Sequence, residues 1–444
     1  MKEKIFLNFS GYLFALLPLL LITGPFLPDL SVSLIAIFFL LNSKVYQNLN
    51  YFKNFFFYFF LALFIYLVIN SIFSDNILFS LKSTIFYCRF FIFALAIWYL
   101  LDKDETWLKY FFYVFIFCFF ILIFDGFYQF FLGKNILGWE VQPGPRVSSF
   151  FDEELILGSY LSRSLPILFG LLLFFYENEK KKVYFFSFIL LTSSEVLTFL
   201  SGERTAFFFI NLSCLIIILF LNNFKIFRLI AYICSLVIII VVMNLYPNSK
   251  SRMIDLTIKQ SLETKQSLEA KQSLEAEQSQ EAEQSQEVLK QLDQKKQLFY
   301  LPKEYNKIYY TSYELFKKNK LFGIGPNMFR KKCDSLATID DTKYACTTHP
   351  HNTYLQLLTE AGIIGFSFVI FLFLTINYIL LKHLYLKIFQ KRIDYLENLN
   401  ICLIVAFYIS LFPLIPSGNF FNNYMSTFYF LPVGIFLWRF NTKK

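Results

Sequence analysis

The sequence predicts an all-α, polytopic membrane protein, and three observations support this fold class. Of its 444 residues, 56% are hydrophobic and only 16% are charged, whereas an ordinary soluble domain has roughly 25% charged residues. The mean hydropathy is +0.51. The apolar residues occur in blocks about 20 residues long, the length with which a helix crosses a hydrocarbon layer of about 30 Å. An ordinary soluble domain is therefore excluded.

About twelve apolar blocks follow one another along the chain, and we predict a helix for each. The first block has no small-residue cleavage site after it, so we expect a retained helix and not a signal peptide. The second is short enough to be tilted or re-entrant. The blocks lie near residues 5–24, 28–43, 54–74, 83–101, 106–128, 154–176, 183–200, 205–221, 226–246, 361–381, 399–416 and 422–440.

The loop charges predict the orientation of these helices. Lys and Arg are concentrated in one alternate set of loops, for example at Lys180 to Lys182, and at both termini. Cationic loops stay in the cytoplasm, so both termini are expected there. The net charge of +9 is therefore explained by topology, and nucleic-acid binding is not indicated. Three regions follow: transmembrane helices over 1–246, an outer loop domain over 247–360, and the last helices with a cytoplasmic tail over 361–444.

The outer loop domain contains a low-complexity array at residues 259–287, with repeats such as QSLEAK. A six-residue step turns successive repeats to different faces of a helix, so the array forms no continuous apolar stripe. We expect a solvated insert without a catalytic role.

Two cysteines lie in the outer loop domain, and the other five lie within apolar blocks. Cys333 and Cys346 can form a disulfide in an oxidising compartment, worth about 3 kcal/mol for a loop of this size. The alternative is a metal site that adds His349 and His351. Because His-Pro-His does not place two imidazoles on one helical face, we predict the disulfide and no metal.

Four arginines are expected at the outer ends of the helices: Arg89, Arg146, Arg163 and Arg204. A cation near lipid is costly, so such residues face a polar cavity or extend to the interface. For Arg89 and Arg163, an ion pair or extension of the side chain to the interface explains the presence of the arginine as well as a functional role does. Several guanidiniums on one face suit a diphosphate, because each binds phosphate oxygens bidentately and keeps its charge.

Arg204 lies in a six-residue polar break, Ser201 to Ala206, between two apolar blocks. Gly202 permits close approach of the backbone there, and we predict an anion site. The alternative is a simple ion pair of Arg204 with Glu203 or Glu195.

His351 is the strongest candidate for a catalytic base. It stands at the start of a polar stripe formed by Asn352, Gln356 and Glu360, which share one helical face at i, i+4 and i+8. A neutral imidazole accepts a proton from a hydroxyl at ambient pH. The alternative is an interfacial histidine that only satisfies a backbone carbonyl.

Four motifs in order, over roughly residues 140–380, resemble the O-antigen ligase and polymerase family of bacterial envelope glycosyltransferases. They are His351-Asn352 with Gly362 and Gly365 downstream, Ser201-Gly202-Glu203-Arg204, the turn Gly323-Ile324-Gly325-Pro326, and the segment from Arg146 to Tyr160, which is similar to Arg-x-Ser-Gly-x-Phe.

The resemblance implies a multi-pass protein of the bacterial inner membrane that works on its periplasmic face. Such an enzyme moves a glycan from an undecaprenyl-diphosphate carrier to an acceptor hydroxyl, with no cofactor and no required metal. His351 would be the catalytic histidine and Arg204 a diphosphate-binding arginine. Further substrate contacts would come from Arg146, Arg163, Arg89, Arg330, Asn352, Gln356 and Glu360, and structural positions from Gly202, Gly323, Gly325, Pro326, Gly362 and Gly365. For a second cation in the outer loop, the chain offers Lys307 and Arg330.

The acceptor is not encoded in these motifs. Lipid A-core is favoured, which would make the protein an O-antigen ligase; an O-antigen polymerase and a protein O-oligosaccharyltransferase are the alternatives. A lipid-linked glycan flippase is the alternative from another class. A transporter should show matching halves and charges near mid-membrane, and the sequence has no internal repeat of that kind. The expected partners are the donor, the acceptor and membrane lipid, with no nucleic acid.

Overall fold

The computed structural model describes residues 2–42, 49–221, 223–260, 303–340, 344–391 and 395–442. Within these ranges the chain is helical and has no β-strand; two isolated bridges, Lys134 with Glu140 and Gln142 with Arg146, lie in one loop. Apart from residues 259 and 260, the low-complexity array lies outside the described residues.

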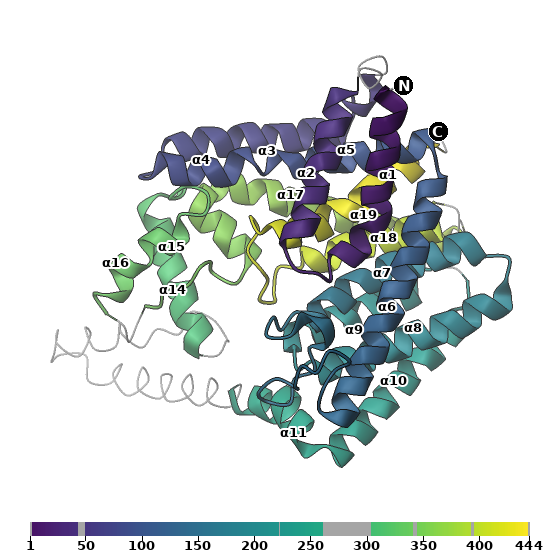
Figure 1. The fold of residues 1–444 in the computed structure, drawn as a ribbon. Helices are drawn as coiled ribbons and strands as arrows, with labels where there is room; N and C mark the ends of the chain where they lie inside the picture. The colour runs from purple at the N-terminus through teal and green to yellow at the C-terminus, as the bar shows by residue number, and fades with distance from the viewer. Residues whose placement is uncertain are drawn as a thin grey trace.

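Each predicted apolar block coincides with a helix, which confirms the all-α class (Figure 1). Seven apolar segments are long enough to cross a membrane by length and composition. The helices that match the blocks are α1 (Lys2–Leu20), α2 (Phe26–Leu41), α3 (Phe55–Ile72), α5 (Cys88–Lys103), α6 (Thr106–Leu132), α7 (Leu157–Tyr176), α8 (Lys180–Leu200), α9 (Arg204–Phe220), α10 (Lys225–Leu245), α17 (Thr353–Phe389), α18 (Asn398–Ser410) and α19 (Asn423–Thr442).

Short helices complete the described chain. α4 (Ile77–Ile85) precedes α5, and 3-10 turns form η2 (Leu49–Tyr51) and η3 (Ser149–Phe151). In the outer loop domain, α11 (Pro247–Lys250) leads into the π-helical turn η4 (Ser251–Asp255). The same domain continues with α14 (Lys303–Lys318), α15 (Phe329–Lys332) and α16 (Asp334–Ala337), which lie together beside α4 and the adjoining end of α17 (Figure 1).

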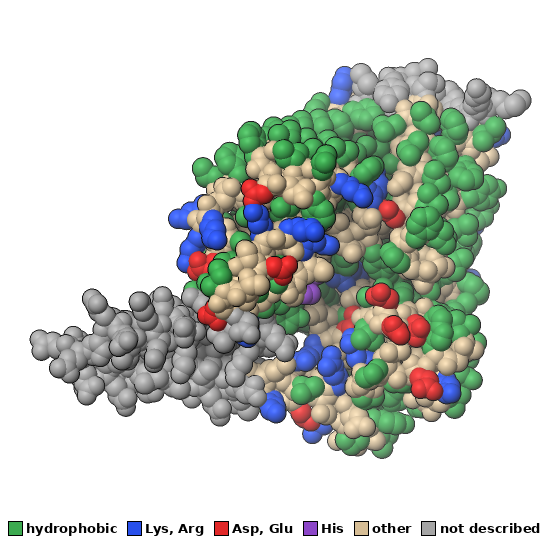
Figure 2. Space-filling model, turned by 60° about the vertical axis from the view of Figure 1, so that its left-hand side comes forward, with side chains coloured by type: hydrophobic (Ala, Val, Ile, Leu, Met, Phe, Trp, Pro, Cys, Tyr) green, Lys and Arg blue, Asp and Glu red, His purple; other side chains and the backbone are tan. Residues whose placement is uncertain are grey.

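The helices differ in how deeply they are buried, as expected for a bundle surrounded by lipid. In the most apolar 18-residue stretch of α7, 89% of the residues are buried, so this helix is central. In the corresponding stretches of α10 and α17, only 22% of the residues are buried, although both helices are strongly apolar. Figure 2 shows apolar side chains over much of the outer surface. An apolar exterior of this kind fits a hydrocarbon environment, in which the backbone is satisfied within each helix.

The connecting loops gather at two ends of the bundle. At the end that we call the site end, Arg89 at the start of α5 pairs with Asp29 of α2, and Asn352 donates to Pro413 O at 2.8 Å. At the opposite end, called the terminal end, Tyr51 donates to Asp102 at 2.6 Å. Both termini lie toward this end in Figure 1. These contacts fit successive helices that cross the bundle in alternating directions. The long segment between α10 and α17 lies at the site end.

α17 contains two helical segments, and the break between them is at Gly362, whose φ is +63°. The turn at 320–325 packs its backbone on the break: Ile324 N donates to Thr359 O at 3.0 Å, and Gly325 N donates to Glu360 O at 2.9 Å. A Cβ on Gly323 would lie 2.6 Å from backbone atoms of α17. Glycine at these positions is therefore required by close packing, and this packing fixes the start of α17 beside the outer loop domain.

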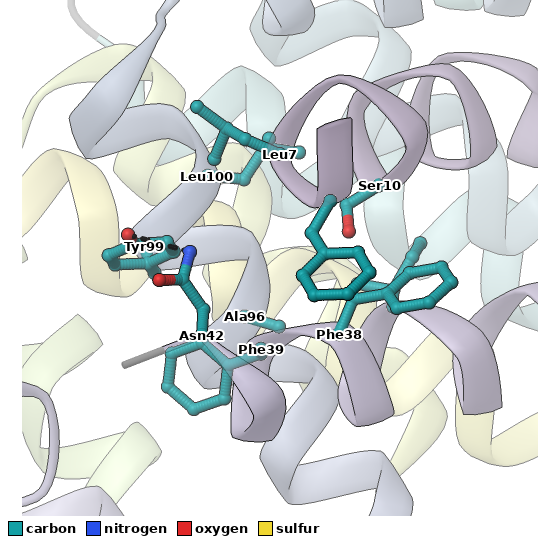
Figure 3. Close-up of a pocket in the computed structure, with 10 residues that line it drawn as sticks. Leu7, Ser10, Phe38, Phe39, Asn42, Ala96, Tyr99 and Leu100 are labelled. Atoms are coloured by element: carbon teal, nitrogen blue, oxygen red, sulfur yellow. Dashed lines mark hydrogen bonds between the residues drawn. The ribbon is translucent and has the colours of Figure 1, made fainter. Parts of the chain in front are cut away.

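A small cleft between α1, α2 and α5 lies at the terminal end. Figure 3 shows its lining, where Asn42 donates to the Tyr99 hydroxyl at 3.0 Å among apolar side chains such as Phe38 and Leu100. Its volume of about 10 Å³ holds no more than about one water molecule. This cleft is too small and too apolar to be a substrate site.

Candidate active site

Three arginines from different parts of the chain form a cluster at the site end, here called the arginine cluster. Arg146 comes from the loop between α6 and α7, Arg204 from the first residue of α9, and Arg252 from η4. Arg146 and Arg204 each lie within electrostatic range of Arg252. Because all three side chains are cations, they repel one another. The sequence predicted Arg146 and Arg204, but Arg252 belongs to no motif and was missed.

The contacts of Arg204 bear on the ion-pair interpretation of this residue. Its Nη1 donates to Thr257 Oγ1 at 3.1 Å and to Gln260 Oε1 at 2.7 Å. The Glu203 carboxylate instead accepts from Gly158 N at 2.6 Å and from the next backbone N–H at 3.1 Å, so it caps the start of α7. Neither this carboxylate nor Glu195, which accepts from Ser235, forms the simple ion pair with Arg204 among the described residues. Neutral groups hold the Arg204 guanidinium in place, so its positive charge is not neutralised by an ion pair among the described residues.

The polar break between α8 and α9 brings Arg146 and Arg204 together. Gly202 has a φ of +68°, and a Cβ there would lie 3.0 Å from the Arg146 side chain. Arg146 Nε donates to Ser201 O at 3.2 Å. A small residue in the left-handed conformation therefore lets the Arg146 side chain lie across the break.

The loop that carries Arg146 is anchored by two buried polar residues of α6 that sequence reasoning missed. Gln129 Oε1 accepts from the backbone N–H groups of Ser148, at 2.9 Å, and Ser149, at 2.7 Å. Asp125 accepts from the Ser149 hydroxyl at 2.6 Å. Ser149 has a φ of +50°, a conformation that glycine adopts more readily. Their signal in the sequence is faint: one Asp and one Gln in the strongly apolar second half of α6.

The two histidines of the outer loop domain lie side by side, before the first turn of α17. The ring centroids of His349 and His351 are 4.2 Å apart. Tyr305 of α14 stands edge-on to His351, with centroids 5.9 Å apart, and Tyr305 is also within electrostatic range of Arg204. In Figure 2 a histidine lies in a hollow, with Lys and Arg side chains both above and below it. Tyr305 thus links the histidines to the arginine cluster.

Burial keeps both imidazoles neutral. It lowers the pKa of His351 below its ordinary value of 6.5. The pKa of His349 falls to about 4, first because of burial and then because His351 and Arg330 lie nearby. Among the described residues, no hydrogen bond occupies the ring of His351, whereas His349 Nδ1 lies 3.0 Å from the Thr348 hydroxyl. His349 Nε2 is also buried without a hydrogen-bond partner in the described chain, so proton acceptance by His351 stays a prediction.

The polar stripe predicted as a substrate contact is occupied by contacts within the protein. Asn352 caps α17 by accepting from Tyr354 N and Leu355 N, both at 3.0 Å. Gln356 donates to Glu360 at 2.9 Å and accepts from Phe420 N at 2.9 Å. Glu360 also accepts from Phe329 N at 2.9 Å, at the start of α15. These three side chains hold the loops around His351 in place, and substrate contact by them stays a prediction.

Arg89 and Arg330 both line a separate cavity of about 480 Å³. Arg89 pairs with Asp29, whose carboxylate is 2.5 Å from Nη2, as the ion-pair interpretation predicted. Arg330, from α15, lies within electrostatic range of His349. Lys82 of α4 lines the same cavity and was not predicted. We call this the second cavity.

Arg163 is buried in α7. Its Nη1 donates to Ser159 O at 3.1 Å, and its guanidinium lies 5.4 Å from the Phe209 ring centre. Glu203 is within electrostatic range, so Arg163 lies near the polar break that carries Arg204. Its Nε is buried with no hydrogen-bond partner in the described chain.

Cys333 and Cys346 are joined by a disulfide, with Cα atoms 4.9 Å apart. The bridge ties the end of α15 to the segment that leads to the histidines. Two disulfide-bonded sulfurs offer no thiolates, so the metal site considered from the sequence lacks half of its donors.

Fold and site together define a class: a polytopic, all-α membrane protein in which loops from one end of the bundle surround a neutral histidine pair and separate groups of cations. Residues 185–370 match the family model described as O-antigen ligase. This segment is similar to an O-antigen ligase-like family, and the similarity supports a ligase or polymerase role of the glycosyltransferase kind. The segment includes Arg204, Arg252, Tyr305, Arg330 and both histidines. No curated protein gives a match to the chain.

Proposed function

We propose that the protein transfers a glycan from an undecaprenyl-diphosphate carrier to an acceptor hydroxyl, on the periplasmic face of the bacterial inner membrane. The observation that carries this proposal is the position of Tyr305, which contacts His351 and lies within electrostatic range of Arg204. A candidate base and a candidate anion site thereby share one surface. Lipid A-core is the favoured acceptor, which makes the reaction O-antigen ligation.

The arginine cluster would bind the diphosphate of the donor. Arg146, Arg204 and Arg252 concentrate positive charge with few acidic partners, and guanidinium groups bind phosphate oxygens in pairs. As the bond between the anomeric carbon and the diphosphate oxygen breaks, the bonding electrons leave with the diphosphate. Fixed cations stabilise the charge that develops there.

His351 would take the proton of the acceptor hydroxyl while its oxygen forms the new bond to the anomeric carbon. Since burial lowers the pKa of His351, the imidazole is unprotonated and ready to accept at neutral pH. Attack from the side opposite the leaving diphosphate inverts the anomeric configuration. The polar stripe of α17 supports the reaction by fixing the backbone around His351.

The distribution of charge favours an enzyme over a flippase. The arginine cluster, the histidines and the second cavity all involve loops of the site end, whereas a transporter requires polar groups along its path through the membrane. Polymerisation of O-antigen and transfer to protein hydroxyls use the same chemistry, so the acceptor distinguishes them.

The test is glycan transfer in vitro by purified protein in lipid nanodiscs, with an undecaprenyl-diphosphate-linked oligosaccharide as donor and lipid A-core as acceptor. His351→Ala should lower kcat by about a hundredfold or more, the usual contribution of a positioned base. Arg204→Ala should lower kcat/KM by a similar factor, and Arg204→Lys should recover part of it. Lys318→Gln is the matched control, since Lys318 is exposed on α14. Full activity of the His351 and Arg204 variants would contradict the proposal.

A further inference from the structure

We propose that the second cavity binds the phosphate groups of an acceptor glycolipid that enters from the membrane beside α4. This inference rests on the proposed function, because it assigns the donor diphosphate to the arginine cluster and the acceptor to a separate site. It favours a phosphorylated lipid acceptor over a protein hydroxyl.

The charge of the second cavity suits a phosphorylated ligand. Three cations line it, Lys82, Arg89 and Arg330, and among its lining residues the one carboxylate is Asp29. That carboxylate is already paired with Arg89. Lys82 and Arg330 form no direct ion pair with a carboxylate in the described part of the chain, although Glu360 lies within electrostatic range of Arg330. Arg330 Nε is buried there without a hydrogen-bond partner. An anion would supply the partner that these cations lack.

The size and walls of the cavity suit a sugar phosphate headgroup. Its volume of about 480 Å³ falls within the range of ligand sites, roughly 300–1,000 Å³. Phe79, Tyr87 and Phe421 provide aromatic walls, while Ser83, Asn327 and Asn423 provide hydrogen-bonding groups. Aromatic faces combined with a few polar groups are well suited to carbohydrate.

The outer surface of α4 suggests how a lipid reaches the cavity. Phe86, the residue that follows α4, lines the cavity and is 60% exposed, and Leu78 of α4 is 83% exposed. Phe73, just before α4, is also largely exposed. Exposed apolar side chains next to a cationic cavity match an amphipathic anion whose chains stay in the lipid while its headgroup enters the protein.

The position of the cavity relative to His351 is suited to an acceptor. Arg330 lines the cavity and lies within electrostatic range of His349, which stacks beside His351. The arginine cluster is connected to His351 through a different residue, Tyr305. Two anionic substrates at separate sites would not compete for the same cations.

The experiment measures equilibrium binding to the full chain in nanodiscs, with diphosphoryl lipid A, monophosphoryl lipid A, undecaprenyl diphosphate and inorganic phosphate as probes. We expect Lys82→Gln to weaken binding of diphosphoryl lipid A by about tenfold, the usual effect of losing one charged hydrogen bond. The same variant should bind undecaprenyl diphosphate as the parent protein does. Lys318→Gln, an equal loss of charge on exposed α14, should change neither affinity.

Three results would overturn the inference: parental affinity of Lys82→Gln for diphosphoryl lipid A, an equal loss of undecaprenyl diphosphate binding, or displacement of the lipid by inorganic phosphate at similar concentration. The second result would assign the cavity to the donor, and the third would make a free anion the ligand. A failure of the proposed function itself would be recognised by a different result: Arg204→Ala would leave undecaprenyl diphosphate binding intact.

Discussion

The ring of Tyr305 stands perpendicular to the imidazole of His351, with an interplanar angle of 88° and centroids 5.9 Å apart. An edge-to-face pair of this kind is worth about 1 kcal/mol and fixes the orientation of both rings. Tyr305 belongs to α14 and His351 precedes α17, so the pair also joins two helices of the candidate active site. We regard Tyr305 as a positioning residue for the base.

Replacement of Tyr305 should therefore affect turnover more than binding. Tyr305→Ala removes the edge-on contact and should lower kcat about fivefold, the rate equivalent of about 1 kcal/mol, with little change in KM. Tyr305→Phe keeps the ring and should retain most of the parental kcat. Steady-state glycan transfer measures both constants, and Tyr313→Ala on the same helix is the control. Equal losses for the Phe and Ala variants would show that the hydroxyl, and not ring packing, is what matters.

The acid limb of the pH profile should report His351. Because burial lowers its pKa below 6.5, the neutral base persists as the pH falls through 6.5 and is lost only at lower pH. The profile of kcat/KM should thus stay level through pH 6.5 and then decline. The pKa of His349 is about 4, so the His351 variant is needed to assign the limb to one of the two imidazoles. The residual activity of His351→Gln should lack the limb, and an inflection at or above pH 6.5 in the parent protein would argue against His351 as base.

The membrane helices could be predicted from the sequence because hydrophobicity alone specifies them. A block of about 20 apolar residues has few stable structures other than a helix in lipid. Boundaries were less accurate where tertiary contacts determine them. The tenth block was predicted to begin at 361, but α17 begins at Thr353, because Asn352 caps it and Glu360 is buried by α15. The first part of the helix contains polar residues, so hydropathy alone did not identify it as helical.

The site was predicted in part, and what was missed depends on tertiary packing. Arg204 and His351 lie in local motifs that are visible in the sequence. Arg252 and Lys82 lie in no motif, and their roles arise only when η4 and α4 are brought to the site end. No local pattern contains that information, since the partners of each residue are distant in the chain.

The glycine turn should be intolerant of even one methyl group. Gly323 and Gly133 both have a positive φ, +73° and +79°, but a Cβ would meet backbone atoms at 2.6 Å only at Gly323. Gly133→Ala should cost about 1 kcal/mol from backbone strain, whereas Gly323→Ala should cost about 2–4 kcal/mol because steric overlap is added. Thermal unfolding of the detergent-solubilised proteins compares them. A similar loss of stability in both variants would show that the turn relaxes away from α17.

Arg252 should contribute to donor binding at the expense of stability. It lies within electrostatic range of Arg146 and Arg204, and its Nε is buried without a hydrogen-bond partner in the described chain. Like charges held together repel one another until an anion binds, as is common at binding sites that sacrifice stability for function. Arg252→Ala should therefore leave the ligand-free Tm unchanged or raise it.

The Arg252→Ala variant should also bind undecaprenyl diphosphate about tenfold more weakly, so the rise in Tm on adding that ligand should shrink. Arg439→Ala provides the opposite case, because Arg439 at the terminal end donates to Glu397 at 2.7 Å and 3.2 Å. Its loss should lower the ligand-free Tm and leave the ligand-dependent rise intact. If Arg252→Ala behaves like Arg439→Ala, then Arg252 is a structural residue, and the donor diphosphate is held by Arg146 and Arg204 without it.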